Sequence, residues 1–207
     1  MTRINRRRLP SLAAASCVVA LSAAVLADDA AREGIQVHGQ WRIEVFDPDG
    51  TRVSTTEFEN ALQNPDVIAQ LMTGQAVYGG WYLSLEGPSP PCLDAQQTQV
   101  TCNIGADGVF YGGLQLHSTN LTVQFSAPGG HILLQGSVTA AASGTVDVVS
   151  SRFDFCTGSD LPPSQCVSQP NNIGPPFTSA VIDPGPSVVP GQLIQVTVDI
   201  SFGSVGG

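Results

Sequence analysis

An apolar–polar alternation near each end of the chain constrains the fold more than any other feature. Residues 35–46 read IQVHGQWRIEVF, and residues 193–202 read LIQVTVDISF. Because successive side chains of a β-strand point to opposite faces, a period of two predicts two long, half-buried strands. The apolar faces hold Ile35, Val37, Trp41, Ile43 and Val45 in the first strand, and Ile194, Val196, Val198, Ile200 and Phe202 in the second. Each strand needs a second layer against which to bury this face.

A turn signal follows the first of these strands. Asp47-Pro48-Asp49-Gly50 combines a proline that presets φ with a glycine that accepts the left-handed conformation. We expect residues 51–58 to return as the second strand of a hairpin. A three-residue turn with a bulge would place Val45 opposite Val53 on the inner side.

One helix is predicted. Asn64 is a favourable N-cap, and Pro65 and Asp66 suit the first turn, where φ is preset and negative charge is stabilised. We therefore expect a short helix near residues 65–73, which Gly74 ends.

The remaining patterned segments also indicate strands. They are residues 78–86, 109–116, 121–127, 131–142, 145–155 and 177–182. Short strands separated by turns about every 8–12 residues are typical of a sandwich. We predict a mainly β protein with a single Ig-like or jelly-roll-like β-sandwich over residues 35–203, followed by a tail over residues 204–207.

The N-terminal segment has the three parts of an export signal. Four arginines lie in the first eight residues, residues 9–27 are uncharged, and Val25 and Ala27 suit a cleavage site. We predict a signal peptide over residues 1–27 and a flexible lead over residues 28–34. The protein would then be extracellular or at the cell surface, with the periplasm also open, and without a membrane segment after cleavage. Sec and Tat export are not distinguished.

The net charge of the chain excludes some classes of binding partner. Once residues 1–27 are removed, four arginines stand against 17 acidic residues and no lysine, a net charge of −13. Such a surface repels nucleic acid and anionic lipid. The acidic composition is compatible with a weak divalent-cation site that involves Asp94 and Asp107. Residues 47–50 resemble the start of a calcium loop, but they lack the third acidic ligand and the closing Glu, so a turn is favoured. We predict no cofactor.

Four cysteines remain after the signal peptide: Cys92, Cys102, Cys156 and Cys166. An even number in an exported chain indicates disulfides, and three pairings are possible. The repeated ten-residue spacing favours Cys92–Cys102 and Cys156–Cys166. The three histidines do not supply the close spacing of a zinc site.

No catalytic motif is found in the sequence, and we predict that the protein is not an enzyme. Glu44, Glu57 and Glu59 could supply the paired carboxylates of a hydrolase, but the predicted register places Glu44 and Glu57 on opposite faces. His38 and His131 are expected on the surface. We consider as a candidate interface the residues Tyr78, Trp81, Tyr82, Val196, Val198, Ile200 and Phe202.

Several segments of the sequence resemble segments of other protein groups. The motifs GQWRIEV at residues 39–45, PDG at residues 48–50 and EFENAL at residues 57–62 resemble the opening of a group of uncharacterised secreted bacterial β-rich proteins. The segments at 121–123, 136–139 and 195–198 are also similar to that group. A looser resemblance links the plan of the chain to small β modules of phage tail fibres. These resemblances imply a structural or surface role and supply no catalytic residues.

Two functions are compatible with these patterns. The first is a subunit of an extracellular filament or surface appendage that binds further copies of itself by strand addition. Its candidate donor strand is the one that holds Ile35, Val37, Trp41, Ile43 and Val45. The alternative is a monomeric adhesin or glycan-binding module that uses the Pro-rich loops at residues 88–108 and 156–176. The two terminal strands could also simply pair with each other within one sandwich.

Overall fold

The computed structural model describes residues 35–106, 117–126, 130–157, 166 and 175–204. The described residues belong to one compact unit. Several predictions lie outside the described residues. These are the signal peptide at 1–27, the lead at 28–34, the strand at 109–116, Asp107, most of the loop at 156–176 and the last residues of the tail.

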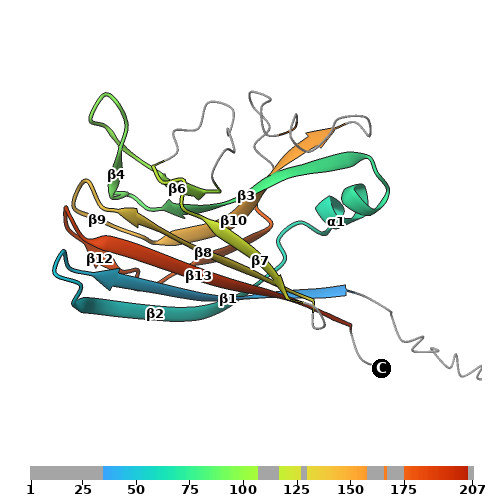
Figure 1. The fold of residues 1–207 in the computed structure, drawn as a ribbon, viewed down its shortest axis with the longest axis horizontal. Helices are drawn as coiled ribbons and strands as arrows, with labels where there is room; N and C mark the ends of the chain where they lie inside the picture. The colour runs from blue at the N-terminus through green and yellow to red at the C-terminus, as the bar shows by residue number, and fades with distance from the viewer. Residues whose placement is uncertain (1–34, 107–116, 127–129, 158–165, 167–174, 205–207) are drawn as a thin grey trace, which may run out of the picture. The chain divides into compact units, whose positions relative to one another are not determined.

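The prediction of a mainly β sandwich is confirmed (Figure 1). The larger sheet has five antiparallel strands in the order β2-β1-β13-β8-β7. Their bounds are Arg52–Ala61 for β2, Ile35–Phe46 for β1, Leu193–Ser204 for β13, His131–Thr139 for β8 and Thr122–Ser126 for β7.

The second sheet has four antiparallel strands in the order β11-β10-β3-β6. Their bounds are Thr178–Val181 for β11, Val148–Thr157 for β10, Ala76–Glu86 for β3 and Cys102–Gly105 for β6. Two small pairs complete the description: β4 (Cys92–Leu93) with β5 (Gln99–Val100), and β9 (Gly144–Thr145) with β12 (Ser187–Val188).

The two terminal strands pair with each other in the middle of the larger sheet. Strand β1 runs antiparallel to β13 along its whole length, from Ile35 opposite Ser204 to Phe46 opposite Leu193. Its other edge pairs with β2, and the other edge of β13 pairs with β8. The described structure therefore matches the interpretation in which both terminal strands belong to one sandwich. The middle of a sheet suits these strands, because neighbouring strands on both edges there pack beside their apolar inner faces.

The hairpin register differs from the predicted one. Val45 lies opposite Ser54 and Phe46 opposite Arg52, with a bulge between Val45 and Phe46. Val53 is consequently 52% exposed rather than packed against Val45, so that expectation was wrong. The bulge places the extra residue, Val53, on β2 and shifts the pairing by one position.

This register also corrects the placement of the acidic residues. Glu57 lies opposite Arg42, whereas Glu44 lies opposite Thr55. Directly opposite residues share a face, and so do residues two apart, so Glu44 and Glu57 project from the same outer face. The prediction that they lie on opposite faces was wrong.

The helix begins where it was predicted and ends one residue earlier. Helix α1 spans Pro65–Met72 and lies beside β3 at one end of the sandwich (Figure 1). The side-chain oxygen of Asn64 accepts a hydrogen bond from the backbone N–H of Asp66 at 3.2 Å, which caps the helix. Val67 is buried, and Ile68 packs against the core. A helix this short is held by such docking rather than by its own hydrogen bonds.

The core fills the space between the two sheets. On β8, Gly136 permits a close approach of the facing sheet: a Cβ there would lie 2.6 Å from Cγ2 of Ile104 on β6. Farther along, Trp81 contacts Phe153 and Phe177 edge-on, with ring centroids 5.1 and 5.2 Å apart. Edge-to-face contacts of this kind stabilise aromatic pairs beyond their buried area.

Both predicted disulfides are present. Cys92 pairs with Cys102 and Cys156 with Cys166, with Cα–Cα distances of 5.3 and 5.6 Å, and all four residues are buried. Such bonds are typical of oxidising extracellular or periplasmic compartments. Among the described residues, no helix is both long enough and apolar enough to span a membrane.

Candidate functional site

The outer face of the five-stranded sheet contains a polar groove of about 490 Å³. Because β1 and β13 alternate strictly, their apolar side chains point into the core and their polar side chains point outward. The groove is lined by Gln40, Trp41, Arg42, Glu57, Phe58, Glu59, Leu133, Thr197 and Asp199. Its volume is in the range of small-ligand sites.

The strand register arranges the lining in two rows across the sheet. One row places Glu59 opposite Gln40, Gln40 opposite Asp199, and Asp199 opposite Leu133. Neighbouring strands lie about 4.8 Å apart, so a row over four strands is roughly 14 Å long. The second row, two residues along each strand, contains Glu57, Arg42 and Thr197 in the same order.

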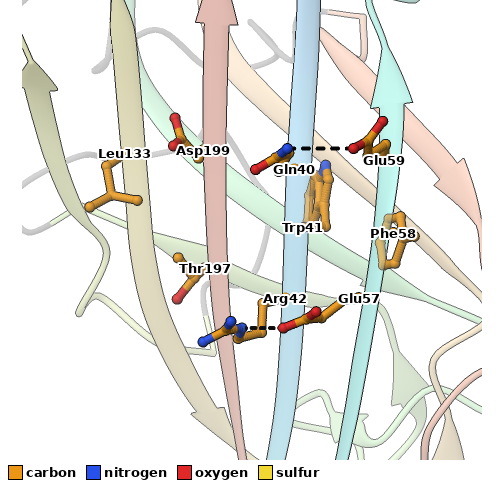
Figure 2. Close-up of a pocket in the computed structure, with 9 residues that line it drawn as sticks. All are labelled: Gln40, Trp41, Arg42, Glu57, Phe58, Glu59, Leu133, Thr197 and Asp199. Carbon is orange, nitrogen blue, oxygen red and sulfur yellow. Dashed lines mark hydrogen bonds and ion pairs between the residues drawn. The ribbon is translucent and has the colours of Figure 1, made fainter.

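Two polar contacts cross from β1 to β2, one in each row (Figure 2). The Nε–H of Arg42 donates to Oε1 of Glu57 at 2.7 Å, and the side chains are 56% and 58% exposed. Nε2 of Gln40 donates to Oε1 of Glu59 at 3.4 Å. A guanidinium has five N–H donors, and a carboxylate accepts several hydrogen bonds. These side chains are therefore held in place and keep unused hydrogen-bonding capacity toward solvent.

Asp199 is held from the other side of the groove. Its Oδ1 lies 2.8 Å from Nδ1 of His131, and both side chains are a little over 40% exposed. Ser201 lies opposite His131 in the register. Within the described residues, however, no hydrogen bond joins the two, so the serine, histidine and aspartate do not form the relay that activates a nucleophile. The pair instead orients Asp199 at the rim of the groove.

Exposure of the histidines agrees with the sequence analysis. His131 is half exposed, and His38 lies on the outer face with Nε2 3.4 Å from Oε1 of Gln36. The groove is also acidic. Its lining contains three carboxylates, those of Glu57, Glu59 and Asp199, and one arginine, Arg42.

The predicted donor strand is part of the core. Val37, Trp41, Ile43 and Val45 are all at most 4% exposed, and they belong to a strand that is paired on both sides. The structure describes the backbone of Ile35 opposite Ser204 but not its side chain.

The predicted interface residues do not form a surface, which corrects that prediction. Trp81, Val196, Val198 and Ile200 are buried in the core between the sheets, and Phe202 is partly buried against the same core. Tyr82 is also buried, but it lies on the opposite face of β3 from Trp81. The side chain of Tyr78 lies outside the description.

The described part of the loop at residues 88–108 is closely tied to the sandwich. Its disulfide is buried, and Oδ1 of Asp94 accepts backbone hydrogen bonds from Gln96 and Thr98 at 2.9 and 2.7 Å. The Asp94 carboxylate thus closes a turn. No group of three or more histidine, cysteine, aspartate or glutamate side chains suited to a metal ion is found in the described part of the chain.

The sequence analysis did not predict that these residues line one groove. Glu57 and Glu59 were considered only as hydrolase carboxylates, and Gln40, Arg42 and Asp199 only as the polar faces of their strands. The alternation does predict that these side chains point outward. It does not say that β1 and β13 are neighbours, and the groove forms only through that pairing.

No protein-family model, curated protein or solved structure matches this chain. The resemblance to secreted β-rich bacterial proteins stays a prediction.

Proposed function

We propose that this protein is an exported, non-enzymatic binding module that recognises its ligand on the outer face of the five-stranded sheet. The observation that carries the proposal is the groove, in which oriented polar side chains from β2 and β1 meet Thr197 and Asp199. These side chains stand on paired strands rather than on loops. Binding groups on rigid elements lose little conformational freedom when a ligand binds.

Export is part of the proposal and has two supports. One is the signal-like segment at residues 1–27, and the other is the pair of buried disulfides. Disulfides persist in the oxidising compartments outside the cytoplasm.

A groove-filling substitution tests the function. The exported, oxidised protein is titrated by calorimetry with three chemical classes of probe: neutral oligosaccharides, heparin and a lysine-rich peptide. Thr197→Trp places a large side chain in the groove, whereas Gln36→Trp changes the same outer face away from it. We expect one class to bind, and we expect Thr197→Trp but not Gln36→Trp to abolish binding. Failure of every class to bind, or equal binding to both variants, would contradict the proposal.

A subunit role in an extracellular assembly is the second candidate, and the edge of β2 favours it. In the described structure, β2 pairs only with β1, and a single bridge from Leu62 to Thr178 meets the other sheet just beyond its end. A free sheet edge can accept a strand from a neighbouring copy. Donation of β1 itself would break its pairing with both β2 and β13.

The charges of β2 set the conditions for testing assembly. Glu57 and Glu59 project from this edge strand, and like charges on an edge oppose pairing between copies. Size exclusion and negative-stain imaging would compare the natural protein with Glu57→Gln/Glu59→Gln. Oligomers or filaments, increased in the variant, would support assembly. Monomers at high concentration in both proteins would exclude edge pairing.

A further inference from the structure

We propose that the groove binds a neutral oligosaccharide whose chain runs across strands β2, β1, β13 and β8. The inference rests on the proposed function and names its ligand class. It starts from the mixture of hydrogen-bonding groups that the register brings together on one face.

The lining combines groups that only accept with groups that donate. Ionised Glu59 and Asp199 accept only, whereas the guanidinium of Arg42 donates only, and Gln40 does both. A hydroxyl group both donates and accepts, so adjacent hydroxyl groups on one ring can use both kinds of partner at once. Few other neutral ligands present such a dense set of hydroxyls.

Charge argues against an anionic ligand. Glu57 is paired with Arg42 at 2.7 Å, and Asp199 lies 2.8 Å from His131. The only arginine at the groove therefore already has a carboxylate partner. The chain has no lysine, and residues 28–207 carry a net charge of −13. A phosphate, sulfate or uronate would have to enter against this field.

Side-chain type argues against a protein partner. Protein interfaces depend on exposed aromatic and aliphatic anchors at their centre. Of the two aromatic residues beside the groove, Trp41 is only 2% exposed and Phe58 packs against the core, stacked on Trp41 at 5.8 Å. Leu133 is the remaining apolar side chain of the lining and is partly buried. One such residue suits the apolar C–H face of a sugar ring.

The dimensions of the groove indicate a ligand of several sugar units rather than a single sugar. The row that contains Gln40 and Asp199 crosses four strands, roughly 14 Å, and the second row lies about 7 Å away along the strands. A single ring would reach only part of either row. We therefore expect affinity to rise with the number of sugar units until the four strands are covered.

Two matched arginines provide the experiment. Arg42 and Arg52 both form cross-strand ion pairs, at 2.7 and 2.9 Å, with the arginines 56% and 60% exposed, but only Arg42 lines the groove. Neutral gluco-, xylo-, manno- and chito-oligosaccharides of one to six units are titrated into the natural protein, Arg42→Ala and Arg52→Ala. We expect Arg42→Ala to raise the Kd about tenfold or more, as when a hydrogen bond to a charged group is lost. Arg52→Ala should change it less than twofold.

The other possible results separate failure of the saccharide inference from failure of the proposed function. Binding should be nearly independent of salt because the ligand is uncharged. If heparin or the lysine-rich peptide binds at the groove and no neutral oligosaccharide does, the saccharide inference fails while the proposed function stands. If oligosaccharides bind with equal Kd to Arg42→Ala and Arg52→Ala, the groove is not their site. If no probe of any class binds, both proposals fail. Thermal unfolding of both variants checks that each is folded.

Discussion

Gly136 should be one of the least replaceable residues of the sandwich. It lies on the inner face of β8, opposite Val196, in ordinary extended backbone. An added Cβ would lie 2.6 Å from Cγ2 of Ile104 and 3.1 Å from Cδ1 of Leu121. Real Cβ atoms do not approach other carbons this closely. Gly136→Ala must therefore push the two sheets apart at this point.

The expected cost follows from these contacts. Ile104 is fully buried and Leu121 is 6% exposed, so neither side chain can move aside into solvent. Inserting a methyl group into a packed core costs about 1–3 kcal/mol. Replacing glycine by alanine also restricts the unfolded chain, which offsets roughly 0.4–1 kcal/mol of this cost. We expect Gly136→Ala to lower the free energy of unfolding by about 1–2 kcal/mol.

Gly203 provides the matched control. It also lies in a strand of the same sheet, but an added Cβ there would have no atom within 4 Å. Gly203→Ala should therefore be neutral or slightly stabilising. Urea unfolding followed by tryptophan fluorescence would measure both variants, with a shift of the midpoint at an unchanged slope taken as a change in stability.

A second substitution identifies the contact responsible. Ile104→Ala removes the methyl group that an alanine at position 136 would strike, so the double variant should be more stable than the sum of the two single losses predicts. The reasoning would be refuted if Gly136→Ala were as stable as the natural protein, or if the two losses were simply additive.

Three further predictions concern other parts of the structure. Replacing both Cys92 and Cys102 by alanine should lower the free energy of unfolding by roughly 2.5–3 kcal/mol, because an 11-residue loop is no longer closed in the unfolded chain; non-reducing urea unfolding measures this loss. Burial lowers the pKa of His117 from its ordinary 6.5 despite the nearby Asp94 carboxylate, so below pH 6.5 the unfolded chain binds more protons than the folded one. Stability should therefore fall as the pH drops through this range, and a flatter pH profile in His117→Gln would confirm the assignment, whereas an unchanged profile would exclude it. Asn64→Ala should cost about 1 kcal/mol, since its side chain accepts a backbone N–H in the first turn of α1; an unchanged urea midpoint would show that this cap does not contribute.

Much of the fold could be predicted because its signals are local. The alternation at residues 35–46 and 193–202 predicted β1 and β13, and the Asn64 cap predicted the start of α1. The pairing of Cys92 with Cys102 also follows from short separation in the chain. Strand periodicity, capping and loop closure each depend on a few neighbouring residues, so one sequence is sufficient to show them.

The groove and the buried aromatics depended on contacts between distant residues. Arg42 and Glu57 come together through a hairpin whose bulge shifts the register by one residue. Asp199 reaches the same site only because the last strand pairs with the first. Trp81 lies in the core because Phe153 and Phe177 cover it.

The sequence by itself determined which residues form strands and which face of each strand is apolar, since both follow from a period of two along the backbone. Only the tertiary structure decided which strands are neighbours. Pairing between β1 and β13 joins residues 147 to 169 positions apart, and many strand orders would bury the same apolar faces. The order that forms is the one in which all the buried faces pack together, and it is this order that assembles the polar groove on the opposite side.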